Sequence, residues 1–256
     1  MINNKKILCV ITARAGSRGI PMKNVKFLLG KPLFIWSVLA ALNSKYIDLV
    51  AVSSNCDEVK RHFFEFIGKD YQRITKENDY ISDKLKWIQR PNCISGPKSK
   101  NEKALIHAYQ YLKKEKNLDF DVIINLQPTS PNRNFSLLDR SIEEYNNGGY
   151  DSLLTATDIT PFIWQKIDKK WAYTVDKNGC CKRKMRQQFK DSEILWHDCG
   201  SIYITETKVL LKTKCRIGKN LCVFPVDKLN SLQIDTEDDF LLIEQMVKIK
   251  KLTSLV

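Results

Sequence analysis

Near the N-terminus, residues 7–24 read ILCVITARAGSRGIPMKN. The first six of these residues are apolar and rich in β-branched side chains, which predicts a strand buried on both faces. The remaining twelve form a polar, glycine-containing loop that starts where this strand ends. Parallel α/β sheets bind phosphate-bearing ligands at that edge, beyond the carboxyl ends of their strands. The segment therefore predicts an α/β fold with a ligand loop after its first strand.

The order of strand and helix continues along the first 150 residues. Apolar runs at 48–53 and 121–126 predict two further buried strands, and helical spacing predicts helices at 32–43, 56–67, 102–113 and 136–145. Strands that alternate with helices at this spacing indicate a mostly parallel sheet with helices on both faces.

The pattern changes after residue 155. Residues 160–195 are polar, aromatic and basic, and the alternation at 171–175 predicts a hairpin that ends near Asn178 and Gly179. We expect residues 156–197 to be a dimerisation excursion within a single domain that spans 1–256. Strands at 201–205 and 222–226 and a helix at 236–249 then complete the fold.

The composition is that of a soluble globular protein with 43% hydrophobic residues. Its net charge of +13 favours anionic partners, although abundant surface lysine that reflects base composition alone would give the same value. No apolar run reaches the roughly 18 residues of a membrane span. The eight cysteines form no CxxC pair, which favours reduced thiols and a cytoplasmic location.

Three cations lie on the loop after the first predicted strand: Arg14, Arg18 and Lys23. Gly16 and Gly19 allow the backbone to pass close to a ligand, so the loop has the charge and shape that a triphosphate needs. It matches neither the Walker A nor the Rossmann glycine pattern. Taken alone, the loop also fits a basic glycine turn without a ligand.

Five segments, in order along the chain, resemble the signatures of the acylneuraminate cytidylyltransferases. They are ARAGSRGIPMKN at 13–24, GKPL at 30–33, LQPTSPNR at 126–133, GSIYI at 200–204 and IDTEDDF at 234–240. The resemblance implies a Rossmann-like, GT-A-like nucleotidyltransferase fold and a homodimer. It also implies that the anomeric hydroxyl of a sialic-acid-like nonulosonic sugar attacks the α-phosphorus of CTP with Mg2+ present, and that nucleic acid and membrane are not partners.

The resemblance also assigns roles to individual residues. It implies that Arg14, Arg18 and Lys23 hold the triphosphate and that Asp235 binds the metal. The residues that it places against the substrates are Arg90, Asn101, Gln127, Gly200 and Tyr203. By itself Asp235 also fits a second role, because acidic residues are favoured in the first turn of a helix.

This chain departs from the family pattern at several positions, among them Asn101, where the family usually has Ser or Thr. Arg18 replaces a lysine, Gln233 replaces an aspartate two residues before Asp235, and Cys199 replaces an asparagine of the sugar pocket. An eight-carbon ulosonate as the acceptor, or a non-catalytic nucleotide-binding or nucleic-acid-binding protein, therefore remain alternatives.

Overall fold

A seven-stranded sheet forms the centre of the computed structural model, with the strand order β11-β7-β10-β6-β1-β4-β5. The structure describes residues 2, 4–16, 19–70, 81–159, 162–167, 169–173 and 185–249. Strand β10 runs antiparallel to both of its neighbours, and the remaining neighbours in the sheet are parallel. The mostly parallel α/β sheet predicted from the sequence is confirmed.

The strands of this sheet are β1 (Ile7–Thr12), β4 (Leu49–Ser54), β5 (Leu85–Gln89), β6 (Val122–Leu126), β7 (Ser152–Ile159), β10 (Leu195–Glu206) and β11 (Leu221–Pro225). Two short pairs lie outside it: β2 (Phe27–Leu28) with β3 (Lys31–Pro32), and β8 (Trp164–Ile167) with β9 (Lys170–Tyr173). Strand β5 was not predicted from the sequence, because Lys86 interrupts its apolar residues and Gln89 ends it.

The α-helices are α1 (Leu33–Leu42), α2 (Asp57–Glu65), α4 (Ile81–Lys84), α5 (Asn101–Lys116), α6 (Phe135–Asn147), α7 (Thr207–Thr213) and α8 (Glu237–Ile249). A π-helix (Phe66–Asp70) continues α2, and short 3-10 turns lie at Lys23–Val25, Asn92–Ile94, Arg186–Gln188 and Asp191–Glu193. Within the described ranges, no helix has the length and apolar character to cross a bilayer.

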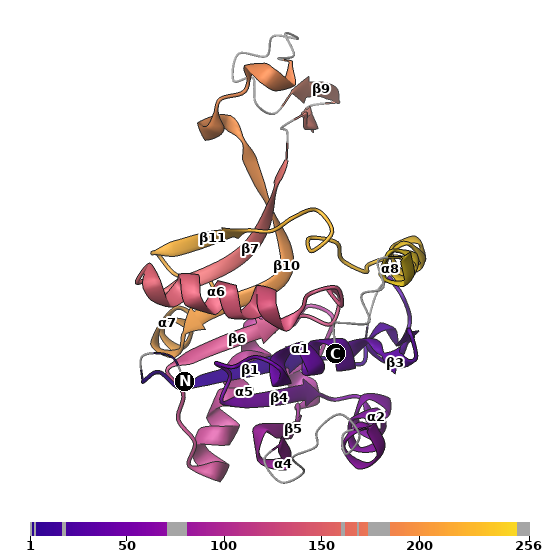
Figure 1. Ribbon diagram of the computed structural model, residues 1–256, viewed down its shortest axis with the longest axis vertical. Coiled ribbons are helices and arrows are strands. Elements are labelled where there is room, and N and C mark those ends of the chain that lie inside the picture. The colour runs from indigo at the N-terminus through magenta and orange to yellow at the C-terminus, as the bar shows by residue number, and fades with distance from the viewer. Residues whose placement is uncertain are drawn as a thin grey trace.

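Helices cover both faces of the sheet (Figure 1). Apolar side chains of α1, α2 and α6 pack on one face, and those of α5 and α7 pack on the other. Strand β1 supplies both cores because successive side chains point to opposite faces: Cys9 and Ile11 face one core, and Leu8 and Val10 the other. A strand buried on both faces explains why residues 7–12 read as a continuous apolar run.

Helix α8 closes the site end of the fold by packing against the loop that follows β1. Phe240, Ile243 and Val247 form a separate apolar cluster with Ile20 of that loop and Trp36 of α1. The same cluster contains Ile234, which is fully buried. This packing brings residues 234–235 next to the loop after β1, although some 210 positions separate them in the sequence.

Strands β7 and β10 run together out of the sheet toward the β8–β9 hairpin (Figure 1). Their pairing reaches Leu195 opposite Ile159, so the two strands support the projecting segment. The hairpin turns between Ile167 and Lys170, where Lys169 adopts a φ of 67°. The turn that we expected near 178–179 lies outside the described residues.

Candidate active site

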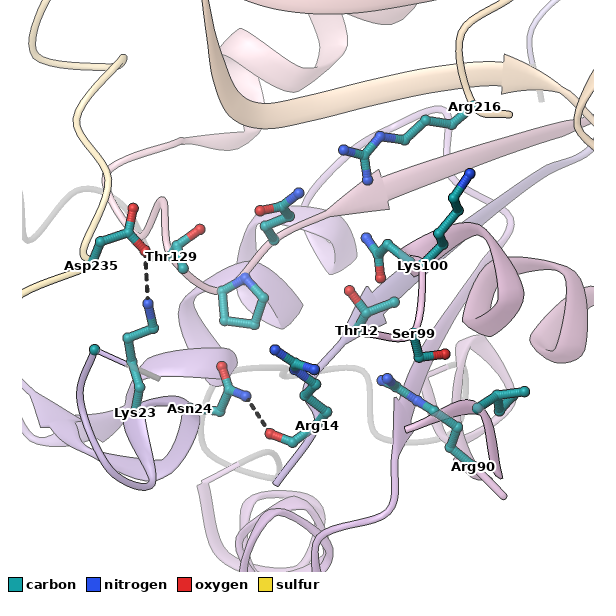
Figure 2. A pocket seen from close by; sticks show the side chains of 15 residues that line it. Thr12, Arg14, Lys23, Asn24, Arg90, Ser99, Lys100, Thr129, Arg216 and Asp235 are labelled. Atoms are coloured by element: carbon teal, nitrogen blue, oxygen red, sulfur yellow. Dashed lines mark hydrogen bonds and ion pairs between the residues drawn. The ribbon is translucent and has the colours of Figure 1, made fainter. Parts of the chain in front are cut away.

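A cavity of about 400 Å³ opens at the carboxyl ends of β1, β5 and β6 (Figure 2). Its lining is made of Thr12, Arg14, Gly19, Lys23, Asn24, Arg90, Ile94, Ser99, Lys100, Asn101, Gln127, Pro128, Thr129, Arg216 and Asp235. Six residues predicted from the sequence meet here: Arg14, Lys23, Arg90, Asn101, Gln127 and Asp235. The predicted contact at Arg18 lies outside the described residues.

The described lining carries five basic side chains and a single acidic one, Asp235. Arg14 donates to the Gly96 carbonyl oxygen at 2.8 Å, and Asn24 donates to the Arg14 carbonyl oxygen at 2.9 Å. Burial, together with the nearby Arg14 charge, lowers the pKa of Arg90 to about 10. Neighbouring cations repel one another, and a bound polyanion would relieve this repulsion. The electrostatics of the cavity therefore favour a phosphate-rich ligand.

Arg90 and Asn101 are held by the ends of the central strands. The Arg90 guanidinium is buried and donates to the Ser53 hydroxyl at 3.2 Å and to the Ser53 carbonyl oxygen at the end of β4. Asn101 donates to the Asn125 side chain at 2.7 Å, and Asn125 in turn donates to the Val10 carbonyl oxygen at 3.1 Å. These bonds fix both residues on the rigid sheet, as an accurate binding site requires.

Lys23 and Asp235 join the two chain segments at one end of the cavity. The Lys23 ammonium donates to Asp235 Oδ1 at 3.0 Å and to the Ile234 carbonyl oxygen at 2.6 Å. The Lys23 side chain is only 10% exposed, whereas that of Asp235 is 69% exposed. The lysine therefore anchors the loop, and the carboxylate remains open toward the cavity.

Asp239, rather than Asp235, supplies the hydrogen bonds that open helix α8. Its Oδ2 accepts from the Thr236 and Asp235 amides at 2.8 and 3.0 Å, and the Asp239 amide donates back to the Thr236 hydroxyl at 3.2 Å. This reciprocal pattern is that of a capping box. Since Asp239 and Thr236 stabilise the first turn, the helix does not require the Asp235 carboxylate.

The backbone that carries Gln127 is clamped by Arg133, a residue that the sequence analysis did not single out. Arg133 is 2% exposed and donates to the Gln127 carbonyl oxygen at 3.2 Å, to the Ser201 carbonyl oxygen at 2.9 Å and to the Ser37 hydroxyl at 2.7 Å. Burial lowers its pKa to about 10. The clamp ties the end of β6 to β10 and α1, and so fixes the wall of the cavity.

We expect Arg133→Met to lower the free energy of unfolding by about 2–3 kcal/mol, because the exchange leaves buried oxygens without a donor. Urea denaturation checks this value. The matched control is Arg140→Met on the exposed side of α6, which should change stability by less than about 0.5 kcal/mol. Equal losses in the two variants would contradict the clamp.

Gly200 and Tyr203 lie on β10 behind the cavity and not in its lining. A pairing irregularity between Asp198 and Tyr203 distorts β10, and Gly200 has a φ of 60° there. A Cβ at Gly200 would lie 2.8 Å from the Gln233 amide, so this glutamine packs directly on the distorted backbone. Tyr203 is 3% exposed and donates to the Asp198 carboxylate at 2.8 Å.

Cys199 also points away from the cavity. Its thiol is buried and donates to the Thr155 carbonyl oxygen at 3.1 Å, and burial raises its pKa. The cysteine that replaces the family's asparagine therefore contributes to the packing between β10 and β7. The lining also contains two basic residues that no motif predicted, Lys100 and Arg216.

The chain is similar in sequence to known cytidylyltransferases. A family model described as "Cytidylyltransferase" matches residues 8–80. The chain is 26% identical over 247 residues to N-acylneuraminate cytidylyltransferase A of Danio rerio, covering 95% of this chain and 51% of that protein. It is 24% identical over 253 residues to CMP-N,N'-diacetyllegionaminic acid synthase of Legionella pneumophila, covering 96% and 98%. The chain thus spans about half of the fish protein and nearly all of the bacterial one.

Among solved structures, a CMP:2-keto-3-deoxy-manno-octonic acid synthetase complexed with CTP has the same fold. It aligns with a TM-score of 0.64 at 14% identity and covers 96% of this chain and 99% of that one. The fold is thereby that of an α/β nucleotidyltransferase. The sequence relatives confirm the resemblance of this chain to the acylneuraminate cytidylyltransferases that its five motifs predicted.

Proposed function

We propose that this protein transfers CMP from CTP to the anomeric hydroxyl of a sialic-acid-like nonulosonic acid and releases pyrophosphate. The observation that carries the proposal is the convergence of three motif segments on one cation-lined cavity. Arg14 and Lys23 come from the first segment, Gln127 from the third and Asp235 from the fifth. The similarity to cytidylyltransferases along the chain supports CTP as the donor.

In this reaction the sugar oxygen forms a bond to the α-phosphorus, while the bond from that phosphorus to the pyrophosphate oxygen breaks. Such transfers depend on positioning and charge stabilisation. Arg14 and Lys23 would offset the charge of the triphosphate and of the departing pyrophosphate. Arg90 and Asn101 would contact the nucleoside, and the neutral Gln127 amide would orient the attacking hydroxyl without repelling phosphate.

Mg2+ belongs to the proposal as the cofactor, and it would help to neutralise the phosphates when bound. Asp235 fits as its protein ligand because a carboxylate with 69% exposure stands beside the cation-lined cavity. Magnesium commonly takes one or two carboxylates together with phosphate oxygens. Since the Gln233 amide packs on Gly200, we propose that Asp235 alone supplies the protein carboxylate.

We also propose a homodimer formed through the projecting segment at 156–197. In the described part of this segment, six large apolar side chains are exposed: Ile163, Trp164, Trp171, Met185, Leu195 and Trp196. Trp171 is 68% exposed. Clustered exposed aromatic residues favour burial against another protein surface, here a second copy of the chain.

We expect the double variant Trp171→Ser/Trp196→Ser to shift the molar mass in light scattering toward that of one chain. Removing two large anchors weakens an interface by several kcal/mol, roughly 4 or more. Leu241→Ser on α8 is the control, because Leu241 is 56% exposed but lies outside the segment. If the double variant and the control have the same mass at every concentration, the segment is not the interface.

A cytoplasmic location completes the proposal. The six described cysteines, four of them buried, are all free thiols. Reducing compartments maintain this state.

The test of the function is pyrophosphate release with CTP, Mg2+ and a panel of acceptors. The panel contains sialic, deaminated neuraminic, legionaminic and pseudaminic acids and an eight-carbon ulosonate. We expect release with at least one nine-carbon acid, and far slower release when ATP, GTP or UTP replaces CTP. Release with the eight-carbon acid alone would favour that alternative, and salt-sensitive oligonucleotide binding without any release would favour the non-catalytic one.

A further inference from the structure

Arg216 lies in the connection between α7 and β11 and lines the cavity from the side of β10. Its side chain is 19% exposed. None of the five motif segments contains it. A guanidinium that is largely withdrawn from water needs partners, and those of Arg216 determine what it can still bind.

Three contacts hold this arginine in place. The guanidinium carbon lies 3.8 Å from the centre of the Tyr203 ring, and Tyr203 is itself fixed by its bond to Asp198. Arg216 Nε lies 3.8 Å from Glu102 Oε1. The Arg216 carbonyl oxygen accepts from the Thr205 hydroxyl. The stacking on Tyr203 and the ion pair with Glu102 orient the guanidinium, and its terminal N–H groups remain available for a planar partner.

The position of Arg216 separates it from the proposed phosphate site. Figure 2 shows Lys23 and Asp235 at one end of the cavity and Arg216 with Lys100 at the other, and the Arg216 guanidinium extends toward the interior. The triphosphate already has Arg14 and Lys23 as cationic partners. Because Arg90 and Asn101 are assigned to the nucleoside, the acceptor is the substrate left for the part of the cavity next to β10.

We propose that Arg216 determines acceptor specificity by donating to a planar, oxygen-bearing group of the sugar, either its carboxylate or an acylamido carbonyl. This inference rests on the proposed function, because it concerns the second substrate of the same cavity. Arginine suits the task because its fork presents two parallel N–H donors to such groups. Tyr203, which the resemblance assigned to the substrate, acts here as the platform under Arg216.

The first experiment compares the steady-state kinetics of Arg216→Gln and Arg216→Lys with those of the wild type. Loss of a charge-assisted bond predicts that Arg216→Gln raises the acceptor KM by roughly 10- to 100-fold. The CTP KM should change by less than about threefold, and Arg216→Lys should fall in between. Lys219→Gln, an exposed exchange in the same connection, should behave as the wild type. Equal increases in both KM values would overturn the proposal.

The second experiment identifies the contacted group through two acceptor analogues, a C1 carboxamide and a deacylated amine. In the wild type, the analogue that lacks the partner of Arg216 should have a lower kcat/KM than the parent acid. In Arg216→Gln, that analogue and the parent acid should have the same kcat/KM. If both analogues are impaired equally in the two proteins, Arg216 makes no such contact, while turnover of the parent acid still supports the proposed function. Absence of turnover by the wild type with every acceptor would remove the proposed function and this inference together.

Discussion

We expect Gly19→Ala to lower kcat/KM for CTP by about 100-fold or more, which corresponds to about 2.7 kcal/mol. A Cβ at Gly19 would collide with the backbone carbonyl oxygen of Asp235, and backbone atoms cannot give way as a flexible side chain does. The loop would have to move away from residues 234–235. That movement would break the Lys23 bonds to Ile234 and Asp235 and displace the cations from the nucleotide.

Gly16→Ala is the matched control for this prediction. Gly16 lies on the same loop, but a Cβ there meets nothing within 4 Å. We expect the Lys23 bonds to survive in this variant, so that its loss of kcat/KM is at least about tenfold smaller than that of Gly19→Ala. Steady-state kinetics of both variants at saturating acceptor checks the pair, and similar kinetics for the two variants would contradict the close approach of the loop to Asp235.

We expect Asp235→Asn to lower kcat by about 100- to 1000-fold while Tm changes by less than about 3 °C. The carboxylate is largely exposed and its partner Lys23 keeps the Ile234 carbonyl oxygen, so the fold loses little. The chemical step loses the only acidic group in the described lining of the cavity. Kinetics over a range of Mg2+ concentrations, together with thermal unfolding, provide the two readouts.

Asp239→Ala should show the opposite behaviour. It removes the acceptor that the capping box uses, so Tm should fall by about 2–4 °C with activity retained. The hydrogen bonds from Thr236 hold the pKa of Asp239 below its ordinary value, so this stability is present above the unfolded pKa and is lost as the pH falls through the folded one. If Asp235→Asn instead loses stability and keeps its activity, the carboxylate serves the helix and not the reaction.

The order of strands and helices could be predicted from local patterns because buried parallel strands and amphipathic helices each leave a periodic signal. Strand β1 and helices α1 and α5 lie within one or two residues of the predicted start or end at most of their termini. Strand β5 carried no such signal because lysine and glutamine interrupt it at the edge of the sheet. The antiparallel direction of β10 depends on chain topology, which residue periodicity does not encode.

Some residues that line the cavity could likewise be predicted from the sequence, and others could not. Arg14, Lys23, Gln127 and Asp235 stand in motif segments. Arg14 and Gln127 meet because parallel strands end at one edge, whereas the packing of α8 brings Asp235 next to Lys23. Arg216 and Lys100 enter the cavity from connections without a motif, so only the tertiary structure reveals them. The roles of Cys199 and Gln233 likewise depended on side-chain direction: one packs on Thr155 and the other on Gly200.

The proposed reaction forms a CMP-sugar at this cavity. The most direct measurement is phosphorus NMR of the wild-type protein incubated with CTP, Mg2+ and a nonulosonic acid. We predict a new phosphodiester signal that grows in equal amounts with pyrophosphate, requires the sugar, and is lost in Asp235→Asn. Signals of CTP that stay unchanged with every nine-carbon acid, or pyrophosphate that forms equally without a sugar, would contradict this reaction.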